Sequence, residues 1–183
     1  MKNRQRIGLN NVSVSYTSQE QVEVYRFSAP VAVLIPLVAL AFQAFVPRWL
    51  PFFNIFDLPL LLVIFFSVAR RSQVTGMLTG AFIGLVQDSL TIHPIGLNGI
   101  AKTVVGYAAS SLGVKIDVEN AGSRFLVVLF FYLVHEAVYF SVARWLVALP
   151  LQWSWRHELG SALANALLAV ALFALLDRFK QRT

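Results

Sequence analysis

The chain has 183 residues, of which 57% are apolar and 13% are charged, and its mean hydropathy is +0.67. These values exclude an ordinary soluble domain and are typical of polytopic membrane proteins. The net charge of +6 comes from basic residues beside apolar runs, as in anchors to an anionic leaflet, so we expect no nucleic-acid binding. The absence of cysteine excludes disulfides and thiolate chemistry.

The first two apolar runs differ in how regular a helix they can form. Residues 27–46 are long enough to cross a bilayer, and longer than a signal-peptide core, so we expect them to be retained. In residues 52–69, Asp57 followed by Leu58 and Pro59 has the pattern of a helix start. The helix that remains is about 18 Å long, shorter than the roughly 30 Å hydrocarbon core. We therefore expect residues 52–56 to be a broken or interfacial lead-in.

Further apolar segments follow at residues 73–90, 95–114, 124–149 and 158–176. The sequence thus predicts an all-α polytopic membrane protein, a compact bundle of six transmembrane helices. We divide the chain into a polar N-terminal segment (1–26), a transmembrane domain (27–177) and a basic tail (178–183).

The basic residues favour one orientation of this bundle. With both termini in the cytoplasm, eleven basic residues face inward and three outward, as the positive-inside rule requires. The inward set is Lys2, Arg4, Arg6, Arg26, Arg70, Arg71, Lys115, Arg124, Arg178, Lys180 and Arg182; the outward set is Arg48, Arg144 and Arg156.

Two charges stand in the stretch QDSLTIHPIGLNGIAK, between the third and fourth segments. Lys102 lies about 10 Å below the outer end of its helix, and its stem leans back toward that end. We expect an intramembrane polar network in which Lys102 pairs with Asp88, while Asn98 and Gln87 fill further hydrogen-bond positions. The alternatives are that Asp88 sits in the headgroup layer and that Lys102 snorkels alone. The turn between them, an outer hairpin, holds His93, Pro94 and Gly96.

Gly76, Gly80 and Gly84 recur at four-residue spacing in the third segment. Such a row lets another backbone approach closely, so we expect it to be a helix-packing face or a partner interface. A partner helix within the same chain is the favoured interpretation, and a different protein is the alternative.

Glu136 follows His135 near the middle of the fifth segment, where an unpaired carboxylate is costly. Adjacent helical residues point about 100° apart, so we do not expect both to serve one inward-facing site. A neutral Glu136 bonded to a neighbouring backbone group or to Asn165 is favoured over a proton relay.

Catalytic signatures are missing from the sequence. There is no Gly-x-Ser-x-Gly motif, no histidine pair with zinc-type spacing and no glycine-rich phosphate loop. We therefore expect no catalytic residue, no metal site, no cofactor and no enzymatic activity.

The order Gly76-x3-Gly80-x3-Gly84-x3-Asp88, followed by HPIGLNGIAKTVVGY, resembles the MreD family of rod-shape-determining membrane proteins. The run DLPLLLVIFF from Asp57 and the short chain are also similar to that family, and the resemblance extends from residue 27 to the C-terminus. The polar first 26 residues depart from the short N-terminus that the family leads us to expect.

The resemblance implies a subunit of the bacterial cell-elongation complex (elongasome), which directs peptidoglycan synthesis from the inner membrane. It implies binding of the bitopic protein MreC and, directly or through it, of the penicillin-binding transpeptidase, the RodA-type glycosyltransferase and the MreB filament. It also implies a fold similar to the substrate-binding component of energy-coupling-factor transporters. We thus expect a non-catalytic scaffold surrounded by membrane lipids. The alternative is a small-solute binding or transport component, suggested by the interrupted second helix with Asp88, Lys102 and Glu136.

Overall fold

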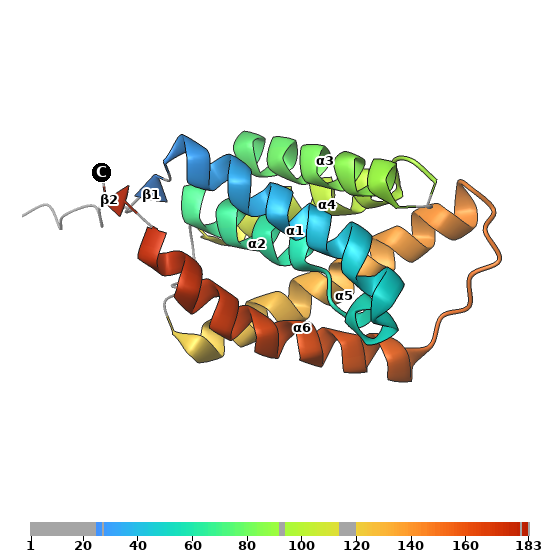
Figure 1. Cartoon of the computed structure of the whole chain (residues 1–183). Helices are drawn as coiled ribbons and strands as arrows, with labels where there is room; N and C mark the ends of the chain where they lie inside the picture. The colour runs from blue at the N-terminus through green and yellow to red at the C-terminus, as the bar shows by residue number, and fades with distance from the viewer. Residues whose placement is uncertain (1–24, 27, 92–93, 114–119, 180, 183) are drawn as a thin grey trace, which may run out of the picture.

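The computed structural model describes residues 25–26, 28–91, 94–113, 120–179 and 181–182. Its helices lie lengthwise beside one another in one bundle, so the all-α prediction is confirmed (Figure 1). The α-helices are α1 (Ala29–Trp49), α2 (Leu58–Arg70), α3 (Gln73–Leu90), α4 (Leu97–Gly113), α5 (Ala121–Trp145) and α6 (Trp155–Leu176). Two short 3-10 helices complete the helical elements: η1 (Pro51–Ile55) lies between α1 and α2, and η2 (Asp177–Phe179) follows α6.

Two short strands bring the ends of the described chain together. β1 (Tyr25–Arg26) pairs antiparallel with β2 (Gln181–Arg182), with Tyr25 opposite Arg182. Both strands lie at one end of the bundle, on the left of Figure 1. The N-terminal segment predicted for residues 1–26 otherwise lies outside the described residues.

α2 is the most buried helix, and its start follows the predicted pattern. The Asp57 side chain caps it by accepting a hydrogen bond from the Leu60 amide at 3.0 Å, and Pro59 occupies the first turn. The preceding η1 confirms the broken lead-in. Leu60 to Ile64 are fully or almost fully buried among the surrounding helices. α2 therefore forms the axis around which the other helices pack.

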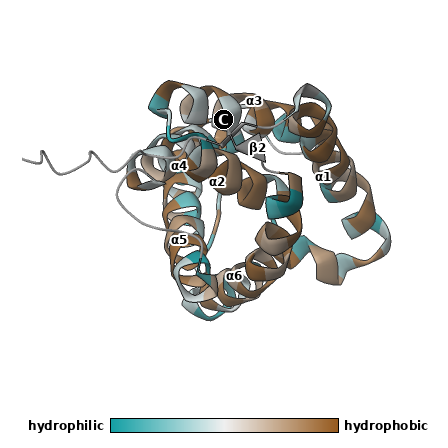
Figure 2. Cartoon of the chain, turned by 90° about the vertical axis from the view of Figure 1, so that its left-hand side faces the viewer, coloured by the Kyte–Doolittle hydropathy of each residue, from teal (hydrophilic) through white to brown (hydrophobic). Residues whose placement is uncertain are grey.

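The outer surface of the bundle is apolar. Large hydrophobic side chains are exposed on five α-helices, α1 and α3 to α6, among them Val38, Leu78, Phe82, Leu126 and Leu167. Viewed along the bundle, hydrophobic residues predominate along α1 and α2 (Figure 2). Soluble monomers rarely expose so much apolar surface, whereas lipid tails solvate it.

Four parts of the described chain are long and apolar enough to cross a membrane: Pro30–Trp49, Pro51–Arg70, Ala121–Trp145 and Trp155–Phe179. α3 and α4 are not among them: glycine, serine, threonine and the charge of Asp88 lower the hydropathy of α3, and α4, with 17 residues, is too short and carries Lys102. The six predicted helices are thus present, and four of them are candidate spans by length and composition. The protein is a multi-pass membrane protein.

Candidate functional site

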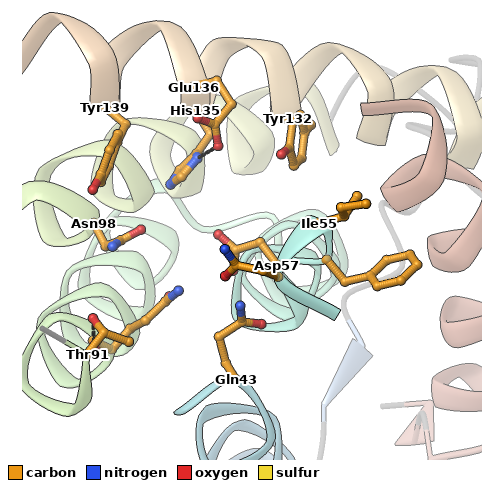
Figure 3. Close-up of a pocket in the computed structure, with 12 residues that line it drawn as sticks. Gln43, Ile55, Asp57, Thr91, Asn98, Tyr132, His135, Glu136 and Tyr139 are labelled. Atoms are coloured by element: carbon orange, nitrogen blue, oxygen red, sulfur yellow. Dashed lines mark hydrogen bonds and ion pairs between the residues drawn. The ribbon is translucent and has the colours of Figure 1, made fainter. Parts of the chain in front are cut away.

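Figure 3 shows a polar cavity of about 160 Å³. Its lining includes the ends of α1 and α3 and the starts of α2 and α4, which lie away from the two strands. Side chains from α1, α4 and α5 converge on it around Asp57. It is lined by Gln43, Asn54, Ile55, Phe56, Asp57, Gln87, Thr91, Asn98, Tyr132, His135, Glu136 and Tyr139.

Lys102 reaches this cluster from α4 and is fully buried. Its ammonium group donates to Asp57 Oδ2 at 2.6 Å and to Asn98 Oδ1 at 3.0 Å, and lies 3.2 Å from His135 Nε2. An ammonium has three N–H donors, so each one has an acceptor. This complete set of partners explains how a lysine can be buried at this position.

The predicted ion pair of Lys102 with Asp88 is wrong: the carboxylate that pairs with Lys102 is that of Asp57. Asp57 is the N-cap of α2, and only one of its oxygens is used by the cap, which leaves Oδ2 for the lysine. The two predicted partners are connected through Asn98, whose Oδ1 accepts from Lys102 while its Nδ2 donates to Asp88 Oδ1 at 2.8 Å.

Asp88 instead caps the N-terminus of α4. Its carboxylate accepts from the amides of Gly96 at 2.8 Å and of Asn98 and Gly99 at 3.2 Å each. The first amides of a helix have no partner within the helix and carry a partial positive charge, so a carboxylate stabilises them. Gly96 has a φ of 106°, which favours glycine at this turn. Of the predicted outer hairpin, His93 lies outside the described residues.

His135 and Glu136 both line the cavity, contrary to the expectation that they serve different faces. His135 Nδ1 lies 3.1 Å from Glu136 Oε1, because the longer glutamate side chain turns back toward the ring. Since His135 Nε2 accepts from Lys102, the network places its proton on Nδ1, which donates to Glu136. The cluster therefore continues from Asp57 through Lys102 and His135 to Glu136.

Asn165 bonds elsewhere than predicted. Its Oδ1 accepts from the Asp57 amide at 2.9 Å, and its Nδ2 donates at 2.8 Å to the carbonyls of Ile55 and Ser161. It thereby ties α6 to the loop that holds Asp57, and it does not bond to Glu136. The predicted bond between Asn165 and Glu136 is wrong, because backbone groups of Ile55, Asp57 and Ser161 occupy the Asn165 side-chain amide.

The glycine row of α3 lies against the backbone of α4. A Cβ atom added at Gly80 would lie 2.1 Å from the Lys102 carbonyl oxygen, and one at Gly84 would lie 2.4 Å from that of Asn98. At Gly76 the nearest backbone atom, 2.3 Å away, is the carbonyl oxygen of Gly106. The structure thus places an internal helix on this row, at the register that carries Lys102 and Asn98 into the cluster.

Sequence reasoning did not assign Asp57, Tyr132, Tyr139 or Gln43 to the site. The sequence pattern marks Asp57 only as a helix cap, although an ionisable residue within an apolar segment is itself a signal of function. The two tyrosines and the glutamine carried no signal of their own, since a single polar or aromatic residue in a membrane helix is common at packing contacts.

The fold and the cluster define a class of small multi-pass helical membrane protein with a connected polar site buried near one end. Residues 25–181 match the family of the rod shape-determining protein MreD, so the chain belongs to the MreD family. This confirms the resemblance, and members of this family are not known as enzymes. Searches among curated proteins and among solved structures found no match.

Proposed function

We propose that the protein is a non-catalytic membrane scaffold of the cell-elongation complex, which docks the transmembrane helix of MreC. Through MreC it couples to the wall synthases and to the MreB filament. The observation that carries this proposal is an apolar groove of about 600 Å³ between α1 and α3. It is lined by Ala32, Val33, Pro36, Leu37, Leu40, Arg70, Thr75, Leu78, Thr79, Phe82 and Ile83.

The wall that α3 contributes to this groove suits a helix. Thr75, Thr79 and Ile83 follow one another at four-residue spacing, so two small hydroxyl-bearing residues lie along one stripe. Small residues let a second helix approach, and threonine hydroxyls can bond across the contact. α1, the opposite wall, is mostly exposed: only 22% of the residues in its apolar span are buried. A single apolar helix laid in the groove would cover both walls.

The proposed orientation has both termini in the cytoplasm. It is supported by the basic residues near that end, including Arg70 and Arg71 at the end of α2, and by the pairing of β1 with β2. In this orientation the polar cavity faces the outer leaflet. The similarity to energy-coupling-factor components stays a prediction.

Replacing Leu78 by tryptophan tests the groove. Leu78 is 65% exposed within it, so the larger ring should obstruct a docked helix without disturbing the bundle. We expect affinity purification of Leu78→Trp to recover at least about ten-fold less MreC than the wild type, the loss of about 1.4 kcal/mol of binding free energy. Leu167→Trp on α6, 66% exposed and outside the groove, is the matched control and should recover MreC normally. Equal recovery with both variants would move the interface elsewhere.

A further inference from the structure

We propose that the polar cavity binds an ammonium group, supplied either by a phosphatidylethanolamine headgroup or by a free primary amine. This inference goes beyond the scaffold function, since the cavity lies nearer the C-terminal end of α3, shares no lining residue with the groove and requires no protein in it. It rests on the unpartnered acceptors, the charges, the aromatic walls and the size of the cavity.

Unpartnered hydrogen-bond acceptors line the cavity. Gln87 is only 6% exposed, yet its Oε1 has no hydrogen-bond partner in the described part of the chain, and the same holds for the buried Oε1 of Gln43. A buried polar atom without a partner is costly. Both residues line the same cavity, which favours a ligand that donates several hydrogen bonds.

The charge in the cavity is negative. The Asp57 carboxylate is neutralised by Lys102, whose three donors are all used. Glu136 receives one hydrogen bond, from His135 Nδ1, and its side chain remains 21% exposed. No lysine or arginine among the described residues pairs with Glu136, so an ammonium ligand would supply the cation that this carboxylate lacks.

Aromatic rings form part of the wall. Phe56, Tyr132 and Tyr139 line the cavity, and Tyr139 stacks on His135 with ring centroids 6.1 Å apart. Aromatic faces attract ammonium groups, and the attraction strengthens where water is excluded. Rings, amide oxygens and a carboxylate together favour an ammonium over an anion.

The size and position of the cavity limit the ligand. At about 160 Å³ it has room for roughly five water molecules and is smaller than the roughly 300 Å³ of ordinary drug-sized sites. Exposed Trp49 and Trp155 lie near the same end of the bundle, as side chains at headgroup level do. The cavity therefore fits an ethanolamine-sized group at the membrane surface.

Two arms of one experiment separate the sources of the ammonium. In the first, the full chain is purified from mixed vesicles holding equal amounts of phosphatidylethanolamine and phosphatidylcholine with the same acyl chains, and bound lipid is measured by native mass spectrometry. We expect phosphatidylethanolamine to be enriched, because choline has no N–H donor. In the second, ethanolamine should raise the unfolding temperature of the detergent-solubilised protein, while ethylene glycol, of similar size but uncharged, should not. Binding in the second arm alone assigns the site to a free amine.

Glu136→Gln removes the charge and keeps the shape of the side chain. We expect about ten-fold weaker ethanolamine binding or lipid enrichment, the effect of losing a charge-assisted hydrogen bond. Asp177→Asn in η2, at the strand end of the bundle, is the control, because it removes one acidic charge far from the cavity, and it should bind as the wild type does. If Glu136→Gln does not fold, Gln87→Leu takes its place, with Gln152→Leu as its control. No ammonium binding in either arm, equal binding of ethylene glycol, or an unchanged affinity in the cavity variant would overturn the proposal.

Discussion

The two sides of α3 are filled very differently. On one side, Gly76, Gly80 and Gly84 leave no room for a side chain, because the backbone of α4 lies where a Cβ would be. On the other side, Leu78 and Phe82 project into a groove that α1 covers only in part. One helix thus carries a closed face and an open face.

This difference separates folding from binding along a single helix. The closed face sets the register of α4, and that register places Lys102 and Asn98 in the polar cluster. The open face contributes little to the bundle itself and remains available to another molecule. Substitutions on the closed face should therefore change stability, and those on the open face should change association.

The largest loss of stability should follow from Lys102→Met, in the helix that packs on the closed face of α3. It leaves the Asp57 carboxylate without its cation and removes a donor from Asn98, and breaking a buried pair in this way costs about 3–5 kcal/mol. For a chain of this length we expect the unfolding temperature in detergent to fall by at least about 6 °C. Thermal unfolding followed by size-exclusion chromatography measures it.

The double variant Asp57→Asn with Lys102→Met is the control for this pair. Asparagine keeps the helix cap and has no charge to leave unpaired, so the double variant should be more stable than Lys102→Met alone. A double variant as unstable as the sum of the two single variants would show that Asp57 and Lys102 do not interact.

The next effect should come from Gly80→Ala. Its Cβ would lie 2.1 Å from the Lys102 carbonyl oxygen, a backbone atom that can yield only if α4 moves, and such overpacking costs about 1–3 kcal/mol. Gly160→Ala on α6 is the matched control, because nothing lies within 4 Å of the added Cβ. Alanine is the better helix former, so this control should be unchanged or more stable by up to about 1 kcal/mol. Equal losses in both would mean that α4 does not close on the glycine row.

Signals within one or two helical turns were enough to predict the bounds of α3 and the start of α2. The expected segment 73–90 coincides with α3, Gln73–Leu90, and the Asp-Leu-Pro pattern correctly placed the start of α2 at Leu58. Cap residues and glycine spacing act over one or two helical turns, so the sequence records them directly.

The partner of Lys102 could not be predicted in the same way. Asp57 and Lys102 are 45 residues apart, and their meeting depends on how α2 lies against the α3 and α4 hairpin. Reasoning within the hairpin selected the nearer acid, Asp88, whose oxygens are taken by the first amides of α4. The groove could not be predicted from the sequence either, because it depends on the distance between α1 and α3 and not on the sequence of either helix.

A smaller and more local effect is expected from Asp88→Asn. Asparagine keeps one acceptor oxygen but loses the charge that stabilises the start of α4, which costs up to about 2 kcal/mol. Hydrogen exchange should quicken at the Gly96, Asn98 and Gly99 amides and change little at the far end of α4. The neighbouring Ser89→Ala, whose hydroxyl bonds only the Leu85 carbonyl among the described groups, should leave that exchange unaltered. Uniform quickening along α4 would contradict a local role for the carboxylate.

The smallest effect on stability should come from the open face, with Phe82→Ala. This ring is exposed in the groove, so in detergent its removal should change the unfolding free energy by no more than about 0.5 kcal/mol. Phe130→Ala, exposed on α5 and outside the groove, is its control and should behave alike when the protein is alone. The two should diverge once MreC is added, because only the Phe82 variant loses contact with a helix docked between α1 and α3. The rise in unfolding temperature that MreC confers should then shrink for Phe82→Ala and persist for Phe130→Ala. A large loss of stability in the isolated Phe82 variant would show instead that this side of α3 is closed as well, by α1 itself.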